Sequence, residues 1–118
     1  MIYQNILEAI GHTPIVQLRR MVPEGAARVL VKYEGLNVGG SIKTRVAYNM
    51  IQDAIAKGKI TKDTIIVEPT SGNQGIGLAL VGAVLGYKVR IVMPVSHPQH
   101  RLSNRFTLPK AEKSVCPK

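Results

Sequence analysis

Residues 65–93 read IIVEPTSGNQGIGLALVGAVLGYKVRIVM, and this stretch decides the fold. Its apolar start predicts a strand over 64–67. The polar, glycine-rich segment that follows predicts a loop and then a helix over 73–85 that ends at Gly86. A second apolar run predicts another strand over 88–93. Alternating strands and helices favour a parallel sheet with helices on its faces, so the predicted fold class is α/β.

The first half of the chain predicts four further elements. A short helix is expected over 5–10, strands over 15–18 and 28–33, and a longer helix over 41–57. An apolar stripe at helical spacing marks one face of the longer helix, and we expect it to lie in the core. Its members are Val46, Ala47, Met50, Ile51, Ala54 and Ile55.

A second glycine-rich segment, residues 37–45, reads NVGGSIKTR. Its two glycines permit a tight turn and a close approach to a flat ligand. Ser41 is the predicted N-cap of the following helix, which places Lys43 in the first turn. A lysine held in this way is a candidate nucleophile towards an aldehyde. The alternative is an ordinary surface lysine after a Gly-Gly turn.

The loop over 68–75 lies between a predicted strand and a predicted helix, a layout typical of an anion site at a helix N-terminus. Backbone N–H groups around Gly72 can hold a carboxylate or a phosphate. The hydroxyl groups of Thr70 and Ser71 and the amide of Asn73 add side-chain partners. The alternative is an ordinary strand-to-helix turn.

Both loops, together with IGHTPIVQL at 10–18, resemble the N-terminal part of the cysteine synthase and cystathionine β-synthase family of pyridoxal-phosphate enzymes (fold type II). The resemblance runs over residues 6–94. It implies a truncated tryptophan-synthase-β-like fold, a three-layer parallel sheet with helices on both faces. Residues 1–94 are then the N-terminal part of such a domain. Residues 95–118, interrupted by prolines, are expected to be an irregular basic tail outside the family.

The resemblance also implies roles for individual residues. Lys43 would be the catalytic lysine, which binds pyridoxal 5'-phosphate covalently and later moves the α-proton of the substrate. Asn73 would bind the 3′-oxygen of the cofactor. The α-carboxylate of the amino-acid substrate would be held by Thr70, Ser71, Gly72 and Gln74.

The implied reaction is β-replacement on O-acetylserine with sulfide to give cysteine, in a cytoplasmic enzyme that is a homodimer at full length. The alternatives are a serine/threonine dehydratase, a diaminopropionate-type synthase, or a non-catalytic fragment that associates with a partner. Gln74 stands where the family often has threonine, which leaves the amino-acid donor open. The family's phosphate-binding loop is absent from this sequence, so impaired activity is expected of a truncated form.

Composition excludes several other classes. The formal net charge is +9, and residues 95–118 hold five of the 16 Lys and Arg residues but one of the seven Asp and Glu residues. With Phe106 as the tail's only aromatic residue, specific nucleic-acid recognition is not expected.

The single cysteine, Cys116, allows no intramolecular disulfide and fits a reducing cytosol. The three histidines form no metal-binding pattern, and no segment predicts a membrane span or a signal peptide.

Overall fold

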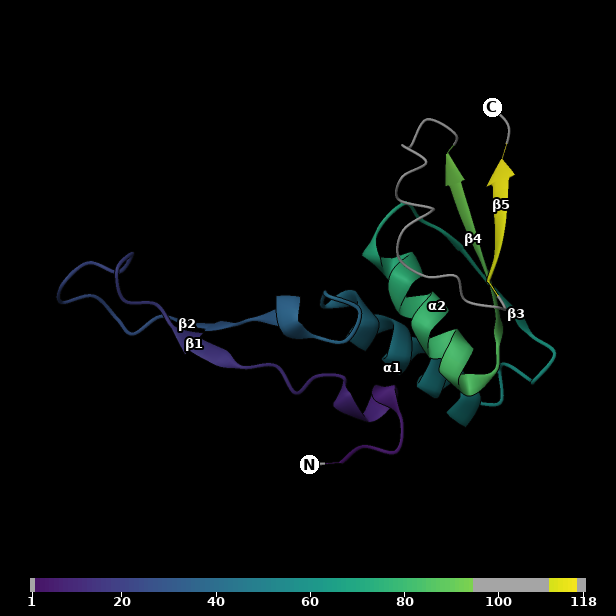
Figure 1. The fold of residues 1–118 in the computed structure, drawn as a ribbon, viewed down its shortest axis with the longest axis horizontal. Coiled ribbons are helices and arrows are strands. Elements are labelled where there is room, and N and C mark those ends of the chain that lie inside the picture. Colours follow the sequence, from purple (N-terminus) through teal and green to yellow (C-terminus); the bar gives the residue numbers. More distant parts are fainter. Residues whose placement is uncertain (1, 95–110, 117–118) are drawn as a thin grey trace.

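The computed structural model describes residues 2–94 and 111–116, and the structural statements below concern these residues. Two helices and a three-stranded parallel sheet form the body, from which an antiparallel hairpin projects (Figure 1). The sheet has the order β3-β4-β5, and the predicted α/β class is confirmed. Its elements are β3 (Ile65–Pro69), β4 (Lys88–Pro94), β5 (Ala111–Cys116), α1 (Lys43–Ala56) and α2 (Asn73–Leu85).

The unit β3-α2-β4 is the centre of the fold. Ile65 pairs with Lys88 and Pro69 with Val92, so β3 and β4 run side by side along their lengths. Helix α2 packs on one face of this sheet, and α1 packs on α2. The layers are therefore sheet, α2 and α1, and the buried core lies between them. Its residues are Leu7, Ala47, Ile51, Leu78, Val81, Tyr87 and Val89.

Glycines in α2 allow these layers to approach closely. A Cβ on Gly82 would clash with the Val89 side chain of β4. A Cβ on Gly77 would lie 3.0 Å from the carbonyl oxygen of Lys43 in α1. Larger side chains here would push α2 away from the sheet or from α1. The small residues of this helix thus permit the close packing of the sheet, α2 and α1.

The N-terminal segment contains a short 3₁₀ helix and the hairpin. Helix η1 (Ile6–Ala9) begins after Asn5, whose side chain accepts the Leu7 N–H at 2.9 Å. Strands β1 (Ile15–Gln17) and β2 (Leu30–Lys32) pair in antiparallel fashion, and η2 (Glu34–Leu36) follows them. These strands form a hairpin of their own rather than joining the parallel sheet, because no crossover helix lies between them. Every residue of both strands is exposed.

The apolar stripe on α1 is only partly buried. Ala47 and Ile51 lie in the core, whereas Val46, Met50 and Ile55 are 39%, 52% and 38% exposed. The prediction that the whole stripe belongs to the core is wrong for these three residues. The reason is that α2 covers one edge of the stripe and no other described element covers the rest.

The tail contains a strand that the sequence did not predict. Ala111–Cys116 form β5, with Ala111 opposite Val89 and Cys116 opposite Pro94. The expectation of an irregular tail is wrong for this segment. It holds no proline, so its backbone N–H groups are available for pairing with β4. Residues 95–110 and 117–118, which include His97 and His100, lie outside the described residues.

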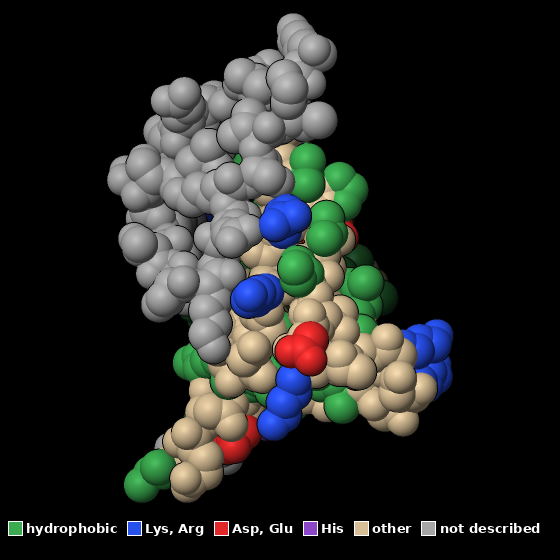
Figure 2. Space-filling model, turned by 90° about the vertical axis from the view of Figure 1, so that its right-hand side faces the viewer, with side chains coloured by type: hydrophobic (Ala, Val, Ile, Leu, Met, Phe, Trp, Pro, Cys, Tyr) green, Lys and Arg blue, Asp and Glu red, His purple; other side chains and the backbone are tan. Residues whose placement is uncertain are grey.

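The helices α1 and α2 both lie on one side of the sheet (Figure 1). On the other side, Ile65 and Val67 of β3 are 45% and 55% exposed. Figure 2 shows hydrophobic side chains on this face, interspersed with basic ones. Across residues 2–94 and 111–116, no helix combines the length and hydropathy needed to cross a lipid bilayer.

Candidate active site

Lys43 is the first residue of α1, and its side chain is exposed. Before it, Gly39 and Gly40 have φ angles of +81° and +73°, a backbone conformation that glycine adopts without strain. The helix begins later than predicted, because Ile42 rather than Ser41 occupies the N-cap position. The Ser41 hydroxyl nevertheless accepts the Lys43 N–H at 3.2 Å, and so holds the start of the helix.

The Arg45 side chain is engaged by Glu34. Arg45 Nε and Nη2 each donate to a Glu34 carboxylate oxygen at 2.8 Å. Nη2 also donates to the Gly11 carbonyl at 2.8 Å and to the Thr13 hydroxyl at 3.2 Å. The hydrogen bonds from Arg45, and then from Thr13, lower the pKa of Glu34 from 4.5 to about 2. The bond to Glu34 raises the pKa of Arg45.

Asn37, which is 5% exposed, connects this ion pair to the glycine turn. Its Oδ1 accepts the N–H groups of Gly11 and Val38, each at 3.0 Å. Its Nδ2 donates to Glu34 Oε2 at 3.1 Å and to the Ser41 carbonyl at 3.3 Å. No functional role is predicted from the sequence for Asn37 or Glu34. Their place just before a Gly-Gly turn is the signal that could have found them.

The loop after β3 leads into α2 at the carboxyl end of the sheet, where parallel α/β proteins bind ligands. Thr70 N–H donates to the Val92 carbonyl at 3.0 Å, and the Thr70 hydroxyl accepts the Gly72 N–H at 3.2 Å. Gly72 is the N-cap of α2 and makes no side-chain cap. The N–H groups of Asn73 and Gln74 find no acceptor among the described residues. At the positive end of a helix, such groups suit an anion.

The side chain of Gln74 points to the neighbouring helix. Its Nε2 donates to the sulfur of Met50 in α1 at 3.8 Å. Sulfur is a weak acceptor, so this bond holds the amide loosely. The backbone of Gln74 therefore lies in the first turn of α2, while its amide group contacts α1.

The packing of α1 on α2 brings the turn over residues 38–43 (the lysine turn) close to the loop that precedes α2. Gly77, whose Cβ would lie 3.0 Å from the Lys43 carbonyl, follows Asn73 by four residues. That separation is just over one helical turn, or about 6 Å along the axis. The backbone of Lys43 is thus about one turn from the start of α2. Because lysine has a flexible four-carbon stem, its amine can reach that region.

A family model described as pyridoxal-phosphate dependent enzyme matches residues 6–105. The chain belongs to this family. The match confirms the resemblance found in the sequence, and it continues beyond the boundary placed at residue 94. The chain is similar to a cysteine synthase from Flavobacterium sp., with 54% identity over 94 residues that make up 80% of this chain and 30% of that protein.

The fold of this chain matches solved structures of fold-type II pyridoxal-phosphate enzymes. A hydrogen sulfide-producing enzyme from Fusobacterium nucleatum superposes with a TM-score of 0.85 at 38% identity, over 98% of this chain and 37% of that one. An O-acetylserine dependent cystathionine beta-synthase from Helicobacter pylori gives 0.83 at 34% identity, over 99% of this chain and 39% of that one. The chain thus spans between 30% and 39% of the length of these relatives.

The described residues of this family member provide binding partners for some of the groups of pyridoxal phosphate. The exposed primary amine of Lys43 suits its aldehyde, and the exposed amide of Asn73 suits a ring oxygen. The unpaired N–H groups at the start of α2 suit an anionic group. No cluster of His, Cys, Asp or Glu within residues 2–94 and 111–116 could hold a metal ion.

Proposed function

We propose that this chain is the lysine-bearing part of a cysteine-synthase-like enzyme, which replaces the acetate of O-acetylserine with sulfide to give cysteine. One observation carries the proposal: the exposed Lys43 lies against α2, about one turn from the first N–H groups of that helix, which have no acceptor among the described residues. The relative named cysteine synthase, at 54% identity, supports this choice of reaction. A cytoplasmic location and a homodimeric full-length form belong to the proposal and rest on the family resemblance.

Lys43 and Asn73 are proposed to act at the cofactor. Lys43 holds it through Nζ and later takes and returns the proton of the substrate's α-carbon. Asn73 donates an amide hydrogen bond to the 3′-oxygen. Pyridoxal phosphate, when bound, supplies the electron-withdrawing ring that stabilises charge at the α-carbon while the β-substituent leaves.

The start of α2 is proposed to hold the α-carboxylate of the amino acid. The N–H groups of Asn73 and Gln74 point out of the positive end of the helix, and hydroxyl groups of Thr70 and Ser71 lie beside them in sequence. Gly72 has no side chain that would obstruct the ligand. The amide of Gln74 can turn from Met50 to the substrate at small cost, because its bond to sulfur is weak.

For the 118-residue polypeptide taken alone, we expect weak, exchangeable cofactor binding and little turnover. The described residues provide partners for the aldehyde, a ring oxygen and the substrate carboxylate. They include no further glycine-rich loop of the kind that holds the cofactor's phosphate group in the family. Electrostatic contacts to that group normally supply much of the binding.

The experiment is a comparison of amino-acid donors on the protein supplied with pyridoxal phosphate and sulfide. O-acetylserine, serine and threonine are added in turn, and the absorbance spectrum, cysteine and 2-oxo acids are measured. A spectral change and cysteine with O-acetylserine support the proposal. A 2-oxo acid from serine or threonine supports the dehydratase alternative. A spectral change with little cysteine is the result expected of this polypeptide taken alone, whereas no spectral change with any of the three donors would contradict the enzymatic proposal.

A second candidate function, a non-catalytic module that associates with a full-length relative, is favoured by the hairpin. Ile15, Val16 and Leu30 are 62%, 47% and 50% exposed there, and isolated two-stranded hairpins are rarely stable in water. Co-purification of the two chains, lost on Val16→Asp, would support this role. Co-purification that persists in this variant would show that the hairpin is not the contact.

A further inference from the structure

One polar cluster holds the lysine turn on both sides. The cluster consists of Gly11, Thr13, Glu34, Asn37 and Arg45. Asn37 Nδ2 binds the carbonyl of Ser41, two residues before the lysine, and Arg45 lies two residues after it. Lys43 is therefore bracketed by two residues whose positions are fixed from outside the helix.

The turn between these anchors has little rigidity of its own. Gly39 and Gly40 are the residues with the widest conformational choice, and since Ile42 provides no side-chain cap, the Ser41 hydroxyl is the one side-chain acceptor described for the N–H groups of the first turn. Helix ends fray when their N–H groups lack such partners. The direction in which Lys43 leaves α1 thus depends on the cluster.

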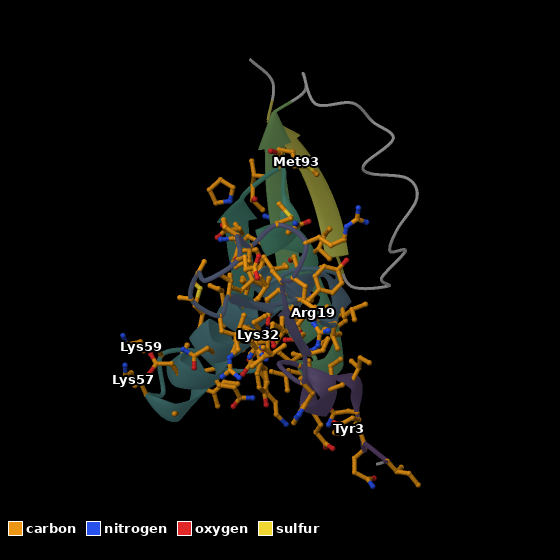
Figure 3. All side chains as sticks on the ribbon, turned by 90° about the vertical axis from the view of Figure 1, so that its left-hand side faces the viewer. Tyr3, Arg19, Lys32, Lys57, Lys59 and Met93 are labelled. Atoms are coloured by element: carbon orange, nitrogen blue, oxygen red, sulfur yellow. The ribbon has the colours of Figure 1, made fainter. Side chains whose placement is uncertain are left out.

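The Glu34–Arg45 pair is the strongest connection in this cluster. It is bidentate, and its side chains are 17% and 34% exposed. Two further acceptors, the Gly11 carbonyl and the Thr13 hydroxyl, fix the guanidinium. The pair Lys57–Asp53, near the other end of α1, is a useful contrast because its side chains are 56% and 50% exposed. Figure 3 shows Lys57 projecting from the edge of the molecule. Exposed pairs of that kind contribute little.

We propose that the Glu34–Arg45 pair positions Lys43 for its reaction with the cofactor aldehyde. The inference rests on the proposed function. In the reaction, Lys43 Nζ takes the place of the aldehyde oxygen, which leaves as water with both protons of the neutral amine. Glu34 and Arg45 touch no reacting atom, so they are positioning residues. They fix the turn from which the amine reaches the loop before α2.

The test uses the full chain with three single changes. Glu34→Gln removes the charge and keeps the side-chain shape. Arg45→Lys keeps the charge and removes the guanidinium group that donates two hydrogen bonds to Glu34. Asp53→Asn removes the exposed pair on the same helix and is the matched control. The first measurement is amide hydrogen exchange of the cofactor-free protein over residues 38–45. The second is the rate at which pyridoxal phosphate becomes attached to Lys43, followed by timed borohydride reduction and peptide mass spectrometry.

Glu34→Gln and Arg45→Lys should speed exchange over residues 38–45 and slow attachment at Lys43 by about tenfold or more, since misplacing a reacting group by about 1 Å can cost up to about 100-fold. Asp53→Asn should leave both unchanged. Wild-type exchange and attachment in both variants would overturn the inference. So would faster exchange spread evenly over the chain, because the pair would then only stabilise the fold.

The two proposals fail in different ways. If no cofactor becomes attached to Lys43 in the unmodified chain, the proposed function fails, and with it the role of the pair in cofactor attachment. The exchange measurement would still report whether the pair orders the turn. If Arg45→Lys does not fold, Thr13→Val takes its place, because it removes only one hydrogen bond to each member of the pair. It should give the same local changes, and wild-type behaviour in it and in Glu34→Gln would overturn the inference.

Discussion

The carbonyl oxygen of Lys43 lies so close to Gly77 that a Cβ there would come within 3.0 Å of it. This contact joins the N-terminal turn of α1 to α2, one turn after Asn73. The packing of the two helices and the placement of the lysine are therefore one structural feature. A change that separates the helices should also displace Lys43.

Gly77→Ala tests that coupling. Alanine in place of glycine stabilises an exposed helix by about 1 kcal/mol. Here the new methyl group would also lie 3.1 Å from Ala47 Cβ and from Thr44 Cα, so we expect overpacking to win and to lower the free energy of unfolding by about 1–3 kcal/mol. Urea denaturation measures the change in the free energy of unfolding. Ala56→Gly at the exposed end of α1 is the control, because it changes helix propensity without changing the packing between the helices. A gain in stability would show that α1 can move away freely.

Lowering the pH should reduce the folding stability of the protein as Glu34 becomes protonated. Its pKa is lowered from 4.5 to about 2 by hydrogen bonds from Arg45 and Thr13, with Lys32 a smaller cause. A carboxylate with a lowered pKa contributes stability that is complete above its unfolded pKa and is lost as pH falls through the folded one. We therefore expect Glu34→Gln to lose stability at neutral pH and to show a shallower decline between about pH 4.5 and 2. Equal pH slopes for Glu34→Gln and the unmodified chain, measured by thermal unfolding, would contradict this.

Thr44 carries a hydroxyl group that the fold does not use. The residue is fully buried, and its Oγ1 has no hydrogen-bond partner among the described residues. Thr44→Val keeps the shape and removes the unpaired oxygen, so stability should stay equal or rise by about 1 kcal/mol. Thr44→Ser keeps the oxygen and loses the methyl group, which should cost about 1 kcal/mol. A clear loss in the valine variant would reveal a partner for the hydroxyl group.

Two valines on α2 offer a test of the core. Val81 is fully buried between the layers, whereas Val84, three residues further, is 41% exposed. We expect Val81→Ala to lower the free energy of unfolding by about 2 kcal/mol because it leaves a cavity. Val84→Ala should change it by less than about 0.5 kcal/mol. Similar losses at both positions would mean that α2 is covered on its outer side as well.

The central unit of the fold could be predicted because its signals are local. The helix over 73–85 and its end at Gly86 are confirmed, and the strand predicted over 88–93 is one residue longer in the structure. Each is marked by an apolar run and a glycine. The hairpin, the exposure of Met50 and strand β5 depend on which elements meet in space, and a local pattern does not contain that information.

The candidate site also has parts with a local sequence signal and parts that depend on contacts in space. Lys43 and the loop before α2 were found as two separate local motifs. Their proximity comes from the contact at Gly77, where the signal was only a small residue in a helix. The link from Glu34 to Arg45 was missed because these residues are eleven positions apart, across a glycine turn that breaks any helical period. The roles proposed for all six site residues stay predictions: Lys43, Thr70, Ser71, Gly72, Asn73 and Gln74.

The most direct measurement is the absorbance spectrum of the protein with pyridoxal phosphate, for the unmodified chain, Lys43→Ala and Lys57→Ala. Lys57 is an exposed lysine on the same helix and serves as the control. We predict a band near about 410 nm in the unmodified chain and in Lys57→Ala, absent from Lys43→Ala. Identical spectra for all three proteins, equal to that of the free cofactor, would contradict the claim that Lys43 holds it.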